Sequence, residues 1–357
     1  MDLTSTPVAI LYQALPPPII DGLRKDAKPG GYSDGGADIA AALRSAGRAV
    51  VTPVANPDPA RALDWVFPDT GAGINAALAA GAGVLWANTV LFEGHPLEAV
   101  IGRVGIVGQT PVAMQRFDDK FDTNRALTAA SLPVAASFLL SATARNGVSG
   151  LDDLPGMALS FPVIVKPVRG RGSQGVTLVD DLPALRIAAA RLLDEATFGD
   201  MLMVEEYLAG EEMTVTVMPP RSPRPSGKRG DAHWALRPVR RFDQRNGVAP
   251  YNGDVPVTRN SAAIGAERLE DEPVRAMIAA CVRAAALVGA RAAIRIDCRA
   301  GADGAFRLFD LNMKPNMTGP GRPGRDDQNC LSGIAARADG WSYADLLGAM
   351  LDAGWTG

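Results

Sequence analysis

Histidine and cysteine are scarce in this chain. Its 357 residues include two histidines, His95 and His233, and three cysteines, Cys281, Cys298 and Cys330. Two histidines argue against a His-rich zinc site and against a mechanism built on a histidine pair. Three cysteines without a C-x-x-C pair leave one thiol over in any disulfide arrangement, which indicates a reducing compartment. If the chain is an enzyme, its catalytic groups must therefore be Lys, Arg, Asp, Glu and backbone groups.

Long apolar runs and a strong charge of one sign are also missing. No run reaches the ~18 apolar residues that a membrane-spanning helix needs. The N-terminal segment has no basic start, and prolines 16–18 interrupt it, so it does not resemble a signal peptide. A net charge of -3 gives no global attraction for nucleic acid or an anionic membrane. We therefore expect a cytoplasmic protein that acts on small molecules, with neither nucleic acid nor membrane as a partner.

The remaining composition is typical of a loop-rich globular protein of two or three domains, with 38 glycines and 27 prolines. Apolar and helical stretches alternate over the first hundred residues, with strands expected at 8–12, 49–53 and 83–86 and a helix at 35–47. This alternation predicts an open parallel α/β unit. The first strand leads into a long loop rich in proline and glycine, at the end of the strand where ligands usually bind in such sheets.

From about residue 109 the pattern changes to an α+β arrangement. A helix is expected in FDDKFDTNRALTAASL, a strand, glycine loop and strand in FPVIVKPVRGRGSQGVTLV, and two strands in MLMVEEYL and EMTVTVM. A long helix (272–289) and two more strands, AAIRIDCRA and FRLFDLNMKP, follow. We predict three units: an N-terminal α/β domain (1–115), a central subdomain (116–208) and a C-terminal subdomain (209–357).

The first chemical motif is VIVKPVRGRGSQGV at 163–176. A buried strand delivers Lys166 and is followed by Gly170, Gly172 and Gly175, with Ser173 among them. Glycines let backbone N–H groups approach an anion closely, and a lysine at the strand end adds positive charge, as a nucleotide's phosphates require. No G-K-[ST] follows, so this is not a Walker A loop. Taken alone, the segment fits a plain glycine turn equally well.

The second motif spans 294–312, IRIDCRAGADGAFRLFDLN. Arg295 and Asp297 are two positions apart on one expected strand, as are Asp310 and Asn312 on the next, so each pair shares a face. A short turn makes the two strands antiparallel neighbours, which lets the oxygen ligands converge. Such ligands suit Mg²⁺ that bridges substrate phosphates. The alternative is a solvated hairpin face with paired charges.

The third motif is MVEEYLAGEE at 203–212. Glu205 and Glu212 flank a corner that bears Leu208. An adenine needs an acceptor for its amino group and a backbone donor for its ring, and a ribose can bind a carboxylate. A charged β-turn is the alternative interpretation.

The order of these motifs, beginning with Lys120 and ending in D-x-N-x-x-P-x-M-T, resembles the ATP-grasp superfamily, and within it the D-alanine:D-alanine ligase branch. The resemblance implies an ATP-grasp fold behind an N-terminal open parallel α/β domain. It also implies that ATP activates a carboxylate as an acyl phosphate, which an amine then attacks to form a peptide or amide bond, releasing ADP and phosphate. The implied substrates are amino acids or amino-acid-like metabolites, and a homodimer is implied by analogy.

The resemblance also assigns roles to individual residues. ATP would contact Lys120, Lys166, Arg169, Gly172, Ser173, Gly175, Glu205, Leu208 and Glu212. Asp297, Asp310 and Asn312 would bind two Mg²⁺ ions, for which Mn²⁺ is an alternative. Catalysis would involve Arg295, Lys166 and Arg240, with Arg241 on the opposite face of its strand.

The sequence departs from the family pattern at the metal and substrate positions. Asp310 stands where glutamate is usual, and Asn316 stands where glycine is usual. The segment GPGRPGRDDQNCLSG replaces a short serine-bearing stretch, so we predict that Arg322 or Arg325 grips the carboxylate of the acceptor. Tyr251 and Asn252 are predicted to contact the donor. Two alternatives stay open: a carboxylase or a ligase acting on a nucleotide or sugar amine, and an ATP-binding protein without turnover.

Overall fold

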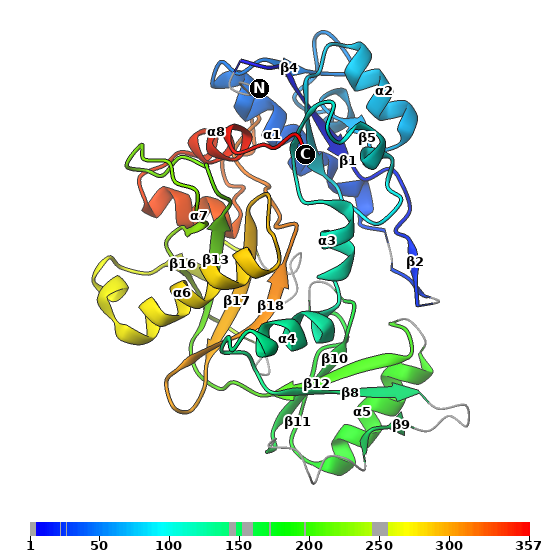
Figure 1. The fold of residues 1–357 in the computed structure, drawn as a ribbon, viewed down its shortest axis with the longest axis vertical. Helices are drawn as coiled ribbons and strands as arrows, with labels where there is room; N and C mark the ends of the chain where they lie inside the picture. The colour runs from blue at the N-terminus through cyan, green and yellow to red at the C-terminus, as the bar shows by residue number, and fades with distance from the viewer. Residues whose placement is uncertain are drawn as a thin grey trace.

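The chain folds around three separate β-sheets (Figure 1). The computed structural model describes residues 5–21, 23–25, 27–142, 148–151, 160–170, 173–195, 198–244 and 256–357. In Figure 1 the first sheet lies at one end of the molecule and the second at the other, with the third beside the helices that join them. The predicted combination of a parallel α/β unit with α+β units is confirmed.

The first sheet is parallel and has the order β4-β1-β6-β7, with β5 also paired to β1. Its strands are β1 (Val8–Tyr12), β4 (Val50–Val51), β5 (Phe67–Pro68), β6 (Val84–Asn88) and β7 (Gly105–Val107), and its helices are α1 (Ser33–Ser45) and α2 (Gly71–Ala79). The loop after β1 contains a small hairpin, β2 (Ile19–Ile20) with β3 (Leu23–Arg24), and a 3₁₀ turn, η1 (Pro29–Tyr32). Two further 3₁₀ turns are η2 (Ala62–Asp64) and η3 (Pro96–Val100). The expected strands and helix are therefore present, with α1 shifted by two residues.

Two short helices, α3 (Pro111–Arg116) and α4 (Lys120–Ala129), lead from the first sheet to the second. The Asp119 side chain accepts a hydrogen bond from the Asp122 N–H at 2.8 Å and so caps α4. The cap fixes Lys120 as the first residue of the helix.

The second sheet is antiparallel, in the order β11-β10-β12-β8-β9. It consists of β8 (Ser137–Ala142), β9 (Val148–Ser149), β10 (Val163–Pro167), β11 (Thr177–Val179) and β12 (Met201–Glu206). Helix α5 (Leu182–Asp194) packs on it and buries Leu185, Ala189 and Leu192 in the same core as the strands. Its buried residues recur every three or four positions, the spacing of an amphipathic helix.

The third sheet has the order β16-β15-β13-β17-β18, and β14 also pairs with β13 in the antiparallel direction. Its strands are β13 (Glu212–Met218), β14 (Trp234–Ala235), β15 (Val239–Arg241), β16 (Ser261–Ala263), β17 (Ile294–Ala300) and β18 (Phe306–Asn312), covered by η5 (Glu267–Glu270) and α6 (Glu272–Leu287). The strands β12 and β13 are consecutive in sequence but belong to different sheets. The chain crosses between the sheets at Gly210, where an added Cβ would lie 2.7 Å from the Ala300 carbonyl oxygen.

The last two helices, α7 (Leu331–Ala338) and α8 (Tyr343–Asp352), return the chain to the first sheet. Helix α8 lies beside α1 (Figure 1), and Leu346 and Leu347 share a buried core with Ile10 and Ile39. The C-terminal segment thus contributes to the core of the N-terminal unit. The boundaries at 115/116 and 208/209 stay predictions.

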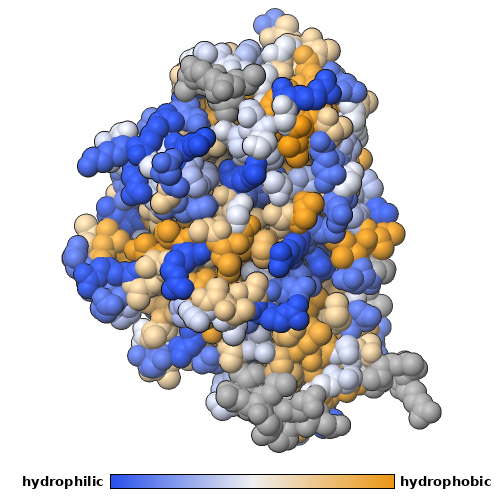
Figure 2. Space-filling view, in the orientation of Figure 1, coloured by the Kyte–Doolittle hydropathy of each residue, from blue (hydrophilic) through white to orange (hydrophobic). Residues whose placement is uncertain are grey.

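The surface has no dominant apolar face in the view of Figure 2, where hydrophobic and hydrophilic residues are intermixed. Exposed large apolar side chains such as Leu63 and Ile187 belong to different units. Among the described helices, none combines the length and the apolar character that crossing a membrane would require.

Candidate active site

A cavity of about 350 Å³ opens where the three units meet. The loop after β1 lines it from the first unit, α3 and α4 from the connection, and β10 and β12 from the second sheet. The third sheet contributes polar residues of β17 and β18. All three units thus contribute to one concave site, a position typical of ligand binding.

Two lysines reach this cavity from different elements. Lys166 on β10 is 3% exposed, and its Nζ lies 2.5 Å from Oε1 of Glu205 and 3.2 Å from the Phe309 carbonyl oxygen. Nζ of Lys120 lies 3.1 Å from Oδ1 of Asp310 and donates to the Gly170 carbonyl oxygen at 3.2 Å. Burial lowers the pKa of Lys120, but Asp310, Asp118 and Glu205 together outweigh it and leave the pKa above its ordinary value. Lys120 and Lys166 are therefore brought together as predicted, beside the glycine loop.

The glycine loop begins at the cavity. Gly170 and Ser173 line it, and Ser173 and Gly175 have positive φ angles of 62° and 71°. A Cβ at Gly175 would lie 2.9 Å from Cγ of Pro167, so glycine permits the tight return to β11. Gly172 lies outside the described residues.

The corner after β12 supplies hydrogen-bonding groups at the cavity wall. Oε2 of Glu205 is buried and has no hydrogen-bond partner among the described residues. Leu208 lines the same wall. Glu212 also lines it and accepts from Nε2 of Gln244 at 2.6 Å. Burial, with a smaller contribution from Asp297, raises the pKa of Glu212 to about 7. The free carboxylate oxygen of Glu205 is placed to accept a hydrogen bond from a ligand's amino group.

Strand register brings the predicted metal ligands together. Asp297 on β17 is opposite Asp310 on β18, and Arg295 is opposite Asn312. Thr214 on β13 donates to Oδ1 of Asp297, and Nε of Arg295 lies 3.2 Å from the same oxygen. Burial would raise the pKa of Asp310, but Lys120 and other cations lower it below its ordinary value. The side chains share one wall of the cavity, as the two-residue spacing predicts.

These side chains fit a magnesium ion whose coordination is completed by a ligand. Within the described ranges, no group of three His, Cys, Asp or Glu side chains converges as a self-sufficient metal site. Mg²⁺ commonly binds one or two carboxylates and completes its octahedron with substrate phosphates and water. Two carboxylates and the Asn312 carboxamide beside Lys120 match that pattern better than a closed metal cage.

The structure corrects the expected facing of two arginines. On β15, Arg240 is exposed and lies near Glu211, with Nε 3.6 Å from Oε1, whereas Arg241 is 7% exposed and lines the cavity. Successive side chains of β15 point to opposite faces of the sheet as expected, but Arg241 rather than Arg240 faces the cavity. Arg169 is also absent from the cavity lining, because Asp21, Asp118 and Asp119 surround its guanidinium at 3.5 Å. The predicted roles of Arg169 and Arg240 stay untested.

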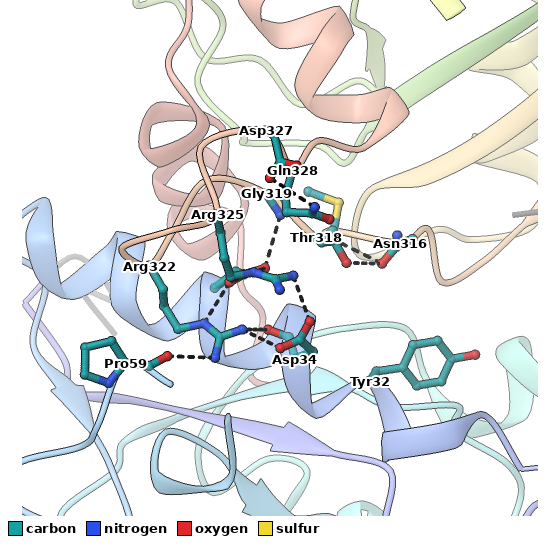
Figure 3. A network of polar contacts seen from close by, with 12 residues as sticks. Tyr32, Asp34, Pro59, Asn316, Thr318, Gly319, Arg322, Arg325, Asp327 and Gln328 are labelled. Carbon is teal, nitrogen blue, oxygen red and sulfur yellow. Dashed lines mark hydrogen bonds and ion pairs between the residues drawn. The ribbon is translucent and has the colours of Figure 1, made fainter. Parts of the chain in front are cut away.

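Arg322 and Arg325 are held in a partly buried ion cluster (Figure 3). Nε of Arg322 donates to Oδ1 of Asp38 at 2.8 Å, and its NH2 donates to Oδ1 of Asp34 at 2.5 Å. Nε of Arg325 lies 2.8 Å from Oδ1 of Asp38, and its NH2 lies 2.8 Å from Oδ2 of Asp34. Neither arginine lines the cavity. Their predicted grip on an acceptor carboxylate stays a prediction, and the visible role is to fasten the loop after β18 to α1.

Several lining residues were not singled out in the sequence, and Lys28, Tyr32 and Lys314 are among them. Lys314 stands two residues after Asn312, where its positive charge between Met313 and Pro315 was the available signal. Burial and the neighbouring Lys28 lower its pKa well below the ordinary value. The predicted donor contacts Tyr251 and Asn252 lie outside the described residues.

Comparison with known proteins identifies the family of the chain. Residues 128–352 match the family model described as D-ala D-ala ligase C-terminus. The chain belongs to the D-ala D-ala ligase family. It is 30% identical over 196 residues to a D-alanine--D-alanine ligase of Acinetobacter baumannii, covering 54% of this chain and 55% of that protein. It is 29% identical over 235 residues to one of Actinobacillus succinogenes, covering 66% and 67%. The first of these matches spans about half the length of the relative.

Solved structures of this ligase family share the fold over nearly the whole chain. The D-alanine--D-alanine ligase from Bacillus anthracis complexed with ATP aligns with a TM-score of 0.64 at 16% identity, covering 97% of this chain and 96% of that one. The enzyme from Coxiella burnetii aligns with a TM-score of 0.65 at 14% identity, covering 97% and 94%. The expected ATP-grasp fold with its N-terminal α/β domain is confirmed.

Proposed function

We propose that this D-ala D-ala ligase family member is an ATP-dependent carboxylate-amine ligase that joins amino acids or amino-acid-like metabolites through an acyl phosphate. The observation that supports the proposal most is the meeting of Lys120 and Lys166 with Asp297, Asp310 and Asn312 on one cavity. A nucleotide's phosphates need both a cationic cradle and a metal site beside it. The family relationship favours ligation over the carboxylase alternative.

Each wall of the cavity has a task in this scheme. Glu205 would accept from the adenine amino group, the Leu208 backbone would donate to the ring, and Glu212 would bind the ribose. Lys120, Lys166 and Ser173 would hold the phosphates. Asp297, Asp310 and Asn312 would hold Mg²⁺, as one ion or two, which when bound neutralises phosphate charge.

The chain's own groups then position the reacting atoms. Arg295 is 8% exposed and lies on the metal-site wall, so its charge acts in a poorly hydrated place. There it would stabilise the oxyanion formed when the amine attacks the acyl phosphate. The cavity would also orient the two substrates and exclude water from them, and neither task requires a histidine.

A substrate panel tests the proposal. ADP release from MgATP should require a carboxylate donor and an amine acceptor together, and the product mass should equal the sum of both minus water. ATP binding without ADP release would favour the alternative of a binding protein. Stimulation by bicarbonate without a condensed product would favour a carboxylase. Cytoplasmic location and a homodimer remain part of the proposal.

A further inference from the structure

One wall of the cavity is made by two lysines around a tyrosine. Nζ of Lys314 lies 3.5 Å from the centre of the Tyr32 ring, and Nζ of Lys28 lies 4.4 Å from the same centre. All three residues line the cavity. Lys28 and Tyr32 precede α1, whereas Lys314 follows β18. The wall therefore forms only where the first and third units meet.

Lys314 differs from Lys120 and Lys166 in having no anionic partner among the described residues. Its Nζ is buried and donates no hydrogen bond to them. By contrast, Lys166 is paired with Glu205, and Lys120 is paired with Asp310. A buried ammonium without a counter-charge is unfavourable, and contact with a tyrosine face offsets only ~0.5–2 kcal/mol. The binding of an anion would remove this imbalance.

The backbone that carries Tyr32 is held in an uncommon conformation. Gly30, Gly31 and Tyr32 have successive φ angles of 70°, 55° and 65°. Nδ2 of Asn88 donates to the Tyr32 carbonyl oxygen at 2.9 Å, and a Cβ at Gly31 would lie 1.9 Å from the Gln13 carbonyl oxygen. A non-glycine residue in this region costs about 1–3 kcal/mol, and such strain is concentrated at ligand sites. The position of the tyrosine is thus fixed before any ligand arrives.

We propose that Lys28 and Lys314 bind a negatively charged group of the substrate, a carboxylate or a phosphate, that is distinct from the carboxylate activated by ATP. This inference rests on the proposed ligase function and names its substrate class: acidic amino acids or their phosphorylated analogues. The carboxylate that ATP activates would instead lie beside Arg295 and the metal-site wall, which is formed by Asp297, Asp310 and Asn312. Lys314 reaches from that wall toward the first unit, where the rest of a small substrate would extend.

Calorimetric titration tests the inference without any turnover. Aspartate, glutamate and O-phosphoserine are the probes, compared with asparagine, glutamine and serine, each with and without MgADP. At least one acid should bind tenfold or more tightly than its neutral counterpart. The acid that binds tightest separates a carboxylate from a phosphate ligand. Failure of the acids to bind, or equal affinity for acid and neutral partner, would overturn the inference.

Matched lysine variants locate the effect. Lys314→Met should abolish the preference for acids, while Lys228→Met, at an exposed loop position, should retain it. Both variants should bind ADP as the wild type does, which shows that the fold and nucleotide site persist. A preference that survives in K314M would overturn the inference. Ligation of neutral amino acids alone would overturn it too, yet leave the proposed ligase function standing.

Thermal unfolding distinguishes a ligand site from a structural role of Lys314. Because the ammonium has no counter-charge in the described structure, K314M without ligand should raise the melting temperature by a few degrees, and K228M should leave it unchanged. A lower melting temperature for K314M would show that the ammonium stabilises the fold and would contradict the proposed ligand site.

Discussion

Arg322 and Asp38 are 284 positions apart and form a hydrogen-bonded ion pair of 2.8 Å in the interior. Asp38 is fully buried on α1, and Arg322 follows β18. Arg322 also donates to the Pro59 carbonyl oxygen at 3.1 Å. This pair therefore fastens the loop after β18, the strand that carries the predicted metal ligands Asp310 and Asn312, to the N-terminal unit.

Removal of the Arg322 charge should destabilise the protein strongly. Arg322→Met leaves Asp38 buried with fewer cationic partners, and breaking such a pair typically costs about 3–5 kcal/mol. Arg325 still contacts Asp38, so the loss should lie at the lower end of that range. Urea unfolding monitored by circular dichroism measures the loss. The control is Arg61→Met, because the surface ion pair of Arg61 with Asp64 should contribute less than about 1 kcal/mol to the free energy of unfolding. An equal loss of stability in R322M and R61M would refute the account of the cluster.

Glu205 should determine the preference for adenine. Its free Oε2 accepts from an amino group, so ATP should bind more tightly than ITP, which carries a 6-oxo group instead. In Glu205→Gln the side-chain amide can donate a hydrogen bond to that oxo group. The ratio of the affinities for ATP and ITP, which is the gap between them, should therefore fall by about tenfold or more. Competition binding measures both affinities. Glu270→Gln, at an exposed position, should leave the gap unchanged, and an unchanged gap in E205Q would place adenine elsewhere.

Asp310 should control the dependence on magnesium. Asp310→Asn removes one of the two carboxylates on the metal-site wall, so the Mg²⁺ concentration for half-maximal ADP release should rise at least tenfold. Asp303→Asn provides the control, because Asp303 lies in the exposed turn of the same β17–β18 hairpin. A magnesium titration compares the three proteins. An identical magnesium requirement in D310N would contradict the assigned role.

Glu212 should make the ligand-free protein less stable as the pH rises. Its pKa is raised by burial to about 7 in the folded state, against an ordinary value of 4.5. An acid with a raised folded pKa contributes stability at low pH that is lost as pH rises through the folded value. Relative to Glu212→Gln, the wild type should therefore lose on the order of 3 kcal/mol between pH 4.5 and 7. Unfolding in urea at several pH values across this range measures both proteins. If the account is wrong, the difference in the free energy of unfolding between the wild type and E212Q will not change with pH.

The convergence of Asp297, Asp310 and Asn312 on one wall of the cavity could be predicted from the sequence, because two-residue alternation on adjacent strands is a local property. Asp297 and Asp310 needed only a short turn between their strands to become neighbours. The facing of Arg240 and Arg241 depends instead on which side of β15 the rest of the molecule covers, and local alternation does not reveal that.

Long-range packing explains what the sequence did not reveal. Lys314 meets Tyr32 only because the loop after β18 packs against the start of α1, and the ion cluster of Arg322 arises from the same packing. Likewise, β12 and β13 are consecutive in sequence, but each pairs with strands from elsewhere in the chain, which places them in two different sheets. The fold class and the presence of Lys120 and Lys166 in one cavity followed from motifs, whereas the wall formed by Lys28, Tyr32 and Lys314 did not.

Oxygen transfer tests the acyl-phosphate ligation most directly. The carboxylate donor identified by the substrate panel would be labelled with ¹⁸O in both oxygens and incubated with MgATP, the acceptor and the protein. Mass spectrometry of the phosphate released should find one ¹⁸O atom in each molecule, because the carboxylate oxygen that attacks the γ-phosphate leaves with it. Formation of the condensed product together with unlabelled phosphate would contradict the proposed function.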